Sequence, residues 1–208
     1  MSDHTPTSSQ EPASEAEFAA ARKAMVVSQL RPQGVSDARV LAAMAVESRE
    51  QYVGADQQAL AYGDRALHLD NGLPMMSPVE LGMLLTRLAP MPGECALVVG
   101  GGGAYTAALL RRIGLDVETA EGVEAPGTAK FDLIIVEGAI ERLPESFGGR
   151  LAPGGRVGAA LISDGVPRLA IGRGVAVAGA ASSIAFTSFA GAGVSALPAF
   201  ASAPAFRF

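Results

Sequence analysis

Four consecutive glycines, Gly100 to Gly103, constrain the fold more than any other feature of this sequence. They follow a short apolar run, Cys95 to Val99, and precede a segment with helical spacing of its apolar residues, Ala104 to Arg112. Glycine permits a tight turn and a close approach of the backbone to a ligand, and the free N–H groups of a helix N-terminus attract anions. This order predicts a nucleotide-type binding loop at the end of a strand in a parallel sheet.

The remainder of the chain predicts an α/β fold. Further apolar runs at 116–120, 131–136 and 156–161 are typical of strands, and helical segments alternate with them. This alternation predicts a doubly wound, mostly parallel sheet with helices on both faces. The C-terminal part differs, because its short apolar runs are separated by small residues, which favours antiparallel strands. We expect these strands at 169–171, 175–178, 184–189 and 206–208.

The N-terminal part predicts helices. Apolar residues recur at helical spacing from Phe18 to Leu30 and from Val40 to Ala45, and a third helix follows Ser77-Pro78, where Glu80 completes a capping-box pattern. Met1 to Ala16 is polar and rich in Ser, Thr and Pro, so we expect a disordered tail there. The expected organisation is this tail (1–16), a helical region (17–92) and an α/β domain (93–208) that forms one compact unit with that region.

Composition excludes several classes of function. The 208 residues carry 16 basic and 21 acidic side chains, a net charge of −5, which argues against nucleic acid as a partner. One cysteine and two histidines make a disulfide framework, a metal site or a histidine-centred hydrolase hard to build, so we expect no metal. No run approaches the roughly 18 apolar residues of a membrane span. We therefore expect a cytoplasmic protein that does not bind membranes.

The glycine loop carries part of a cofactor-binding pattern. Gly100 and Gly102 form a G-x-G pair, and the third small residue is Ala104. The Lys-Ser/Thr pair of a P-loop does not follow it. Glu121 stands 21 positions after Gly100, at the end of the next expected strand, where an acidic residue binds ribose hydroxyls. A glycine turn followed by an acidic residue also arises by chance, so these residues alone leave an ordinary turn as an alternative.

Several ordered motifs around the loop resemble the protein-L-isoaspartate O-methyltransferase family. They extend from about Phe18 to Leu161 and comprise 22–30, 35–44, Ser48 to Val53, Ala61 to Asp64, Met76-Ser77, the loop ending in Tyr105, Phe131 to Val136, Leu143-Pro144 and Arg150 to Arg156. The C-terminal segment with Leu197-Pro198 looks like the closing strands of a bacterial subgroup of that family.

The resemblance implies a class I methyltransferase fold that uses S-adenosylmethionine to methylate isoaspartyl carboxylates in damaged proteins. It implies that Gly100, Gly102 and Ala104 form the cofactor loop, that Glu121 holds the ribose, and that Ser77 belongs to the active-site segment. Ser77 is equally well explained as a helix N-cap, and both roles can hold together. A carboxylate is already a nucleophile at neutral pH, so this chemistry needs positioning and desolvation more than a catalytic base.

Three other residues of these motifs favour structural roles. Tyr105 is expected to pack behind the loop more readily than to contact a ligand. Arg49 and Asp64 are expected to hold the N-terminal helices together through ion pairs and caps, and not to touch substrate.

The sequence departs from the family pattern near the cofactor. Val98 replaces an acidic residue, Met75 replaces a threonine, and Ala104 replaces the third loop glycine. Only nine residues, 122–130, stand where the family has a helix, a strand and the turn that cradles the adenine. Nine residues reach at most about 32 Å and cannot hold a crossover helix. We therefore expect an extended crossing that bends at 125–127, and a sheet truncated on that side.

Two functions remain open at this point. The first is an S-adenosylmethionine-dependent protein carboxyl methyltransferase that acts on isoaspartyl residues. The second is a degenerate relative that keeps the scaffold as a non-catalytic binding or interaction module, for which we expect weak or absent S-adenosylmethionine binding. A dinucleotide-dependent oxidoreductase is disfavoured, because no proton donor is evident. The oligomeric state is not determined by the sequence.

Overall fold

The computed structural model describes residues 14–120, 127–175 and 183–201. Its helices are α1 (Glu15–Met25), the π-helix η1 (Val26–Leu30), α2 (Ala38–Val46), the 3-10 helices η2 (Arg49–Tyr52) and η3 (Gln58–Leu60), α3 (Pro78–Leu88), α4 (Gly103–Ile113), α5 (Glu145–Gly148) and the 3-10 helix η4 (Pro198–Phe200). Its strands are β1 (Leu67–His68), β2 (Pro74–Met75), β3 (Cys95–Gly100), β4 (Asp116–Ala120), β5 (Phe131–Ile140), β6 (Leu151–Ser163), β7 (Val166–Val175) and β8 (Ser183–Gly191).

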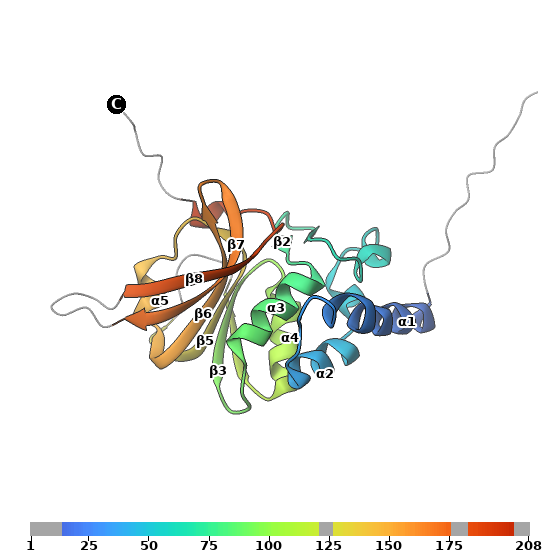
Figure 1. Cartoon of the computed structure of the whole chain (residues 1–208), viewed down its shortest axis with the longest axis horizontal. Helices are drawn as coiled ribbons and strands as arrows, with labels where there is room; N and C mark the ends of the chain where they lie inside the picture. Colours follow the sequence, from blue (N-terminus) through green and yellow to red (C-terminus); the bar gives the residue numbers. More distant parts are fainter. Residues whose placement is uncertain (1–13, 121–126, 176–182, 202–208) are drawn as a thin grey trace, which may run out of the picture.

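A six-stranded sheet in the order β4-β3-β5-β6-β7-β8 forms the centre of the molecule (Figure 1). The four strands β4, β3, β5 and β6 are parallel, whereas β7 and β8 add to the sheet as antiparallel strands. This arrangement confirms the predicted α/β fold with an antiparallel end. β4 and β5 lie on either side of β3, and β4 forms the sheet edge among the described residues.

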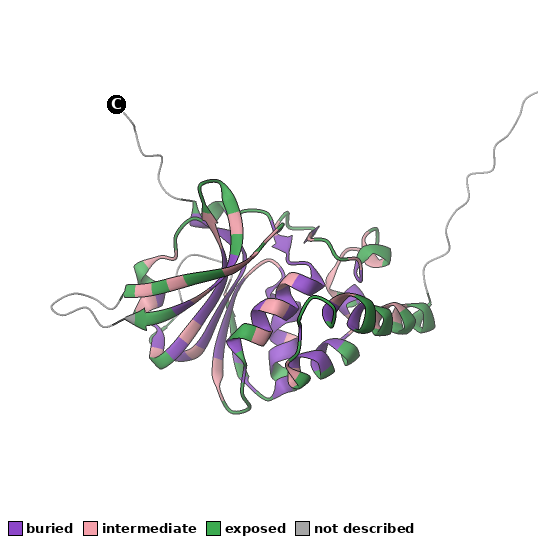
Figure 2. Cartoon of the chain, in the orientation of Figure 1, coloured by how far each residue is buried: buried purple, intermediate pink, exposed green. Residues whose placement is uncertain are grey.

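The two faces of the sheet are covered differently. Alternate residues of β3 point to opposite faces: Ala96 and Val98 join a core with α2, α3 and α4, whereas Leu97 and Val99 join a second core with Phe147 of α5. In Figure 1 the helices α1 to α4 lie together on one side of the sheet. Within the described ranges, the opposite face carries only the short helices α5 and η4. Figure 2 shows the buried residues along the central strands and on the inner surfaces of α3 and α4.

Local sequence signals explain where the N-terminal helices begin. α1 starts at Glu15, two residues earlier than expected, because Ser14 and Glu17 form a capping box. Asp37 caps α2 by accepting hydrogen bonds from the N–H groups of Arg39 and Val40. α3 begins at Pro78 after the N-cap Ser77, as predicted. The remainder of the predicted tail lies outside the described residues.

The C-terminal strands differ from the prediction. Residues 166–175 form one continuous strand, β7, which is longer than the strand expected at 169–171, and residues 176–178 of the next expected strand lie outside the described residues. Gly172 interrupts the apolar pattern of this segment, yet it pairs with Phe186 of β8, and a Cβ at Gly172 would lie 2.5 Å from a methyl carbon of Ile184. The glycine is therefore required by close packing within a strand. The expected strand 206–208 and most of the expected bend at 125–127 lie outside the described residues.

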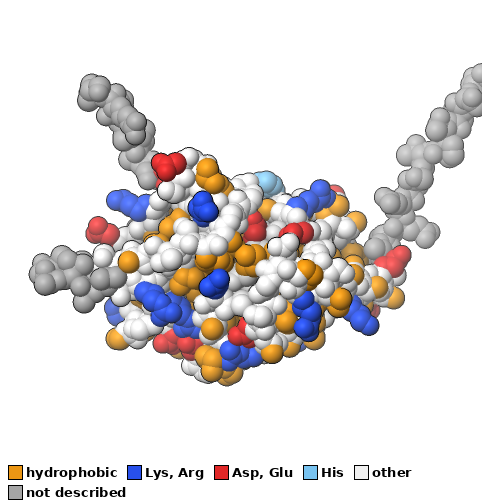
Figure 3. Space-filling view, in the orientation of Figure 1, with side chains coloured by type: hydrophobic (Ala, Val, Ile, Leu, Met, Phe, Trp, Pro, Cys, Tyr) orange, Lys and Arg blue, Asp and Glu red, His pale blue; other side chains and the backbone are white. Residues whose placement is uncertain are grey.

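Among the described residues, every helix is too short or too polar to cross a membrane. No three His, Cys, Asp or Glu side chains of that part of the chain gather as a metal site. On the face shown in Figure 3, acidic and basic side chains are interspersed.

Candidate active site

The glycine loop joins the end of β3 to the start of α4, as the sequence predicted. Gly100 adopts a left-handed φ of +109°, which glycine tolerates without strain. It lies opposite Glu137 in the pairing of β3 with β5. Gly102 is the N-cap of α4 and no side chain caps the helix there among the described residues, so N–H groups of its first turn stay available to a ligand.

The first three glycines of the loop are each needed for a close contact within the protein. A Cβ at Gly100 would lie 2.5 Å from the carbonyl oxygen of Glu137, and one at Gly102 would lie 2.0 Å from its carboxylate. A Cβ at Gly101 would lie 2.3 Å from Cβ of Leu73, in the segment that leads into β2. The loop is therefore packed between the end of β5 and the β1–β2 hairpin.

Ser77 follows β2 and lines the wall of a pocket of about 640 Å³. Its Oγ accepts a hydrogen bond from the N–H of Glu80 at 3.2 Å, and its own N–H donates to Glu80 Oε2 at 3.0 Å. The N-cap role is thus confirmed. Glu80 Oε1 also accepts from the N–H of Gly193, which ties the start of α3 to the segment after β8. The other lining residues include Asp64, Arg65, His68, Met83 and Ser195.

Glu137 is a fully buried carboxylate in β5, opposite Gly100, where the sequence predicted no functional residue. It accepts hydrogen bonds from the Thr106 hydroxyl of α4 and from the N–H of Met76, which lies 3.2 Å away. Burial raises its pKa, and the bonds from Thr106 and Met76 and the charge of Arg49 only partly oppose that effect. An acidic residue between apolar residues in the interior of β5 was a signal that could have identified it.

Arg49 is also fully buried, but it does not form the ion pair that we expected. Its Nε donates to the carbonyl oxygen of Ala61 at 2.9 Å, and an Nη atom donates to that of Met76 at 2.5 Å. Its guanidinium lies 4.9 Å from the centre of the Tyr105 ring. Burial lowers the pKa of Arg49. Carbonyl oxygens satisfy most of this guanidinium, because no carboxylate of the described residues lies within ion-pair distance of it.

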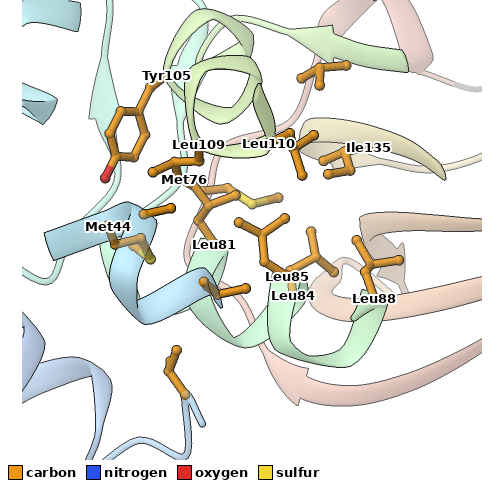
Figure 4. Close-up of a cluster of buried hydrophobic side chains, with 14 of the residues drawn as sticks. Met44, Met76, Leu81, Leu84, Leu85, Leu88, Tyr105, Leu109, Leu110 and Ile135 are labelled. Atoms are coloured by element: carbon orange, nitrogen blue, oxygen red, sulfur yellow. The ribbon is translucent and has the colours of Figure 1, made fainter. Parts of the chain in front are cut away.

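Tyr105 packs behind the loop, as predicted. It is fully buried and meets the Tyr52 ring edge-on, with the centroids 5.4 Å apart. Figure 4 shows Tyr105 and Met76 in the same apolar cluster, which also contains Leu81, Leu109 and Leu110. The cluster fixes the back of α4 and the residue that precedes Ser77. The site is therefore supported by a rigid core on its inner side.

Beside the start of α4, a pocket of about 460 Å³ opens to solvent at Ala104. Asp70, Asn71, Gln51 and Tyr52 line its walls together with neighbouring residues. The predicted residues Gly100, Gly102 and Ala104 are thus brought together, and Ser77 lies just beyond Met75 and Met76, which adjoin the loop. Glu121 lies outside the described residues. Asp64 lines the Ser77 pocket and is therefore accessible to a molecule bound there.

Comparison with known proteins identifies the family. Residues 21–125 match the family model described as protein-L-isoaspartate(D-aspartate) O-methyltransferase. The protein-L-isoaspartate O-methyltransferase of Methylorubrum extorquens is 32% identical over 166 residues, which cover 67% of this chain and 73% of that protein. The chain belongs to the protein-L-isoaspartate(D-aspartate) O-methyltransferase family. The enzyme of Methylorubrum populi is similar as well, at 33% identity over 66% of this chain and 78% of its own length.

Solved structures support the fold of this methyltransferase family member. A Plasmodium falciparum protein-L-isoaspartate O-methyltransferase, crystallised with S-adenosyl-L-homocysteine, superposes with a TM-score of 0.65 at 15% identity and covers 86% of this chain and 97% of its own. Another protein-L-isoaspartate O-methyltransferase gives a TM-score of 0.67 at 16% identity, over 85% of this chain and 65% of its own. At these identities the likeness concerns the fold alone.

Proposed function

We propose that this protein is an S-adenosylmethionine-dependent carboxyl methyltransferase that acts on isoaspartyl residues of proteins or peptides. The observation that carries the proposal is the contact between the glycine loop and the Ser77 segment. A Cβ at Gly102 would lie 2.9 Å from Cγ of Met75, two residues before Ser77. The loop that fits a cofactor and the serine that lines the large pocket thus meet across Met75 and Met76. Membership of the family supports the same activity.

The residues at the start of α4 fit the amino-acid end of S-adenosylmethionine. The uncapped N–H groups there suit its carboxylate, and Asp70 lines the adjoining pocket and suits its positive charge. Gly100 and Gly102 let the backbone approach, and Ala104 leaves the pocket open. For the ribose we propose Glu121, from its position after β4. When bound, the cofactor supplies a methyl group on a sulfonium, an electrophile with its own leaving group.

The protein's own part in the reaction is to place and desolvate the substrate carboxylate. Ser77 Oγ accepts from the Glu80 N–H and keeps its hydroxyl hydrogen free to donate to that carboxylate. The carboxylate is the nucleophile, so no group of the protein has to remove a proton. The rate then depends on in-line alignment and on exclusion of water. The pocket beside Ser77 is large enough for a peptide segment.

A non-catalytic binding module is the second candidate, and one observation favours it. Ten residues separate the end of β4 from the start of β5, and β4 is the edge of the described sheet. An adenine ring bound on that side of the loop would therefore contact fewer protein atoms than the family pattern provides. The module would keep the fold and the Ser77 pocket while binding S-adenosylmethionine weakly or not at all.

Two measurements on the full chain separate these candidates. Transfer of labelled methyl groups is measured with an isoaspartyl peptide, and the same peptide with ordinary aspartate is the matched control. Calorimetry measures S-adenosyl-L-homocysteine binding independently of turnover. We expect micromolar binding and transfer to the isoaspartyl peptide alone. Absence of both supports the module and contradicts the methyltransferase.

The cellular setting is also a proposal. We infer a cytoplasmic location, because the single cysteine, Cys95, is free and the sequence makes no disulfide framework. Isoaspartyl-containing proteins are the partners that the proposed activity requires. Fractionation of cells that express the full chain tests the location directly, and recovery in a membrane or secreted fraction would contradict it.

A further inference from the structure

Met76 is the residue directly before Ser77, and both polar groups of its backbone are bonded to buried charged side chains. Its N–H donates to Glu137 Oε1 at 3.2 Å, and its carbonyl oxygen accepts from Arg49 at 2.5 Å. Glu137 and Arg49 are each 0% exposed. The Met76 peptide is therefore held from two directions by groups that water does not reach.

The Glu137 carboxylate also contacts the glycine loop and the helix that follows it. Its Oε2 accepts the hydrogen bond from Thr106, and its Oε1 fills the space that a Cβ at Gly102 would occupy. One side chain therefore touches the loop, the start of α4 and the peptide next to Ser77. A shift of any of these three parts changes the geometry of the other two.

We propose that Glu137 and Arg49 are positioning residues that fix the Ser77 segment against the glycine loop. This inference rests on the proposed function, because it takes Ser77 as the residue that meets the substrate carboxylate. Neither Glu137 nor Arg49 has to touch the substrate, since both act through Met76. We call the two side chains the Met76 clamp.

Stability alone is a poor explanation of the Met76 clamp. Burial disfavours the charged form of both residues. It therefore raises the pKa of Glu137 and lowers that of Arg49. Apolar side chains of similar volume often stabilise a core as well as buried charges do, or better. Directional hydrogen bonds to buried charges instead specify one arrangement of the groups they join. The contribution of the clamp is therefore a defined position for the Met76 peptide.

The hydrogen bonds of Ser77 hold this residue from the side opposite the glycine loop. Glu80 holds the Ser77 N–H and its Oγ from the α3 side, while the Met76 clamp holds the preceding peptide from the loop side. With both neighbours fixed, the direction of the free hydroxyl hydrogen is set by the protein. Without the Met76 clamp, Ser77 would still cap α3, but it could move together with the start of that helix.

Substitution of Glu137 tests the clamp. Glu137→Leu removes both hydrogen bonds and the buried charge, and we expect kcat for an isoaspartyl peptide to fall about tenfold while the Kd of S-adenosyl-L-homocysteine changes less than about threefold. Glu137→Gln keeps an acceptor for Met76 and a donor for the Thr106 oxygen, and it should restore kcat to within about twofold. Glu94→Gln, which weakens an ion pair at the other end of β3, controls for general loss of stability.

Amide hydrogen exchange provides a readout that does not depend on turnover. In Glu137→Leu we expect the Met76 amide to exchange about tenfold faster, relative to the Val157 amide of β6 as an internal reference. Unchanged Met76 exchange, or an unchanged kcat, overturns the proposal. If the unmodified protein transfers no methyl group, the proposed function fails, and the exchange measurement still decides whether Glu137 fixes this segment.

Discussion

The two strands that flank β3 give the glycine loop unlike surroundings. On one side, β5 carries Glu137 opposite Gly100, and this residue is buried and bonded to Thr106 and to the peptide before Ser77. On the other side, β4 is a five-residue strand at the sheet edge, and three of its five side chains are exposed. The loop is thus supported by a buried polar network towards Ser77 and by a short edge strand towards Glu121.

This difference indicates how the binding energy for a cofactor would be divided. Loop and helix groups on the β5 side can orient the amino-acid end and the methyl group of the cofactor. That orientation determines the rate of methyl transfer. The β4 side, where the nucleoside would lie, contributes mainly affinity. A family member with a shortened β4 side can therefore lose affinity before it loses the geometry of methyl transfer. The predictions below test this division.

The largest effect is expected from Gly102→Asp. Its Cβ would lie 2.0 Å from Glu137 Oε1 and would bring a second carboxylate to a buried one. We expect cofactor binding and methyl transfer to fall about 100-fold or more. Gly149→Asp is the matched control, because Gly149 is exposed and a Cβ there would have its nearest neighbour at 3.5 Å. Retained binding in Gly102→Asp would show that the loop does not hold the cofactor.

A smaller effect is expected from Ser77→Ala. It removes the N-cap of α3 and costs about 1 kcal/mol of unfolding free energy, and it lowers kcat/KM about tenfold through loss of the hydroxyl. Asp37→Ala removes the N-cap of α2 and should cost similar stability without changing kcat/KM. Denaturant unfolding and peptide kinetics measure the two quantities. Equal kinetics in both variants would restrict Ser77 to its capping role.

A matched pair of valines compares the two flanking strands directly. Val136 of β5 is 0% exposed and Val117 of β4 is 7% exposed. We expect Val136→Ala to cost about 2 to 3 kcal/mol of unfolding free energy and Val117→Ala about 1 kcal/mol, because the edge strand can relax into the space left. Chemical denaturation measures both. Equal losses would mean that β4 is packed as firmly as β5.

The smallest effect concerns pH and lies at the opposite end of β3. Burial acts to raise the pKa of Glu94, but hydrogen bonds from Arg156 and from the Met91 N–H outweigh it, so the pKa is lowered. Glu94 therefore stabilises the fold above the ordinary glutamate range, and this stability is lost as pH falls through its lowered pKa. Thermal unfolding below about pH 5 should show a shallower pH dependence in Glu94→Gln. An identical slope would remove Glu94 from the acid response.

Local patterns predicted the elements that local chemistry determines. The capping box at Ser77, the extent of β4 and the strand–loop–helix order at Gly100 all follow from residues within a few positions of one another. These features depend on hydrogen bonds and packing that neighbouring residues already specify.

The remaining features depend on residues distant in sequence. Glu137 and Met76 are 61 positions apart, and Arg49 and Met76 are 27 apart, so no periodicity relates them. Arg49 was expected to hold the N-terminal helices together through an ion pair, whereas the fold offers it two carbonyl oxygens. Similarly, the strand expected at 169–171 continues through Gly172, because the side chains that cover this glycine belong to β8. Tertiary packing decided each of these points.

The bond between Glu80 and Gly193 has a consequence for the order in which the protein acquires its parts. These residues are 113 positions apart, so the wall of the Ser77 pocket closes only after β8 has been added to the sheet. Contacts of such long range form late, because closing a long loop costs chain entropy before any contact compensates for it. On the ribosome, the helices and the glycine loop can assemble first, whereas the Ser77 pocket is completed only after β8 has joined the sheet.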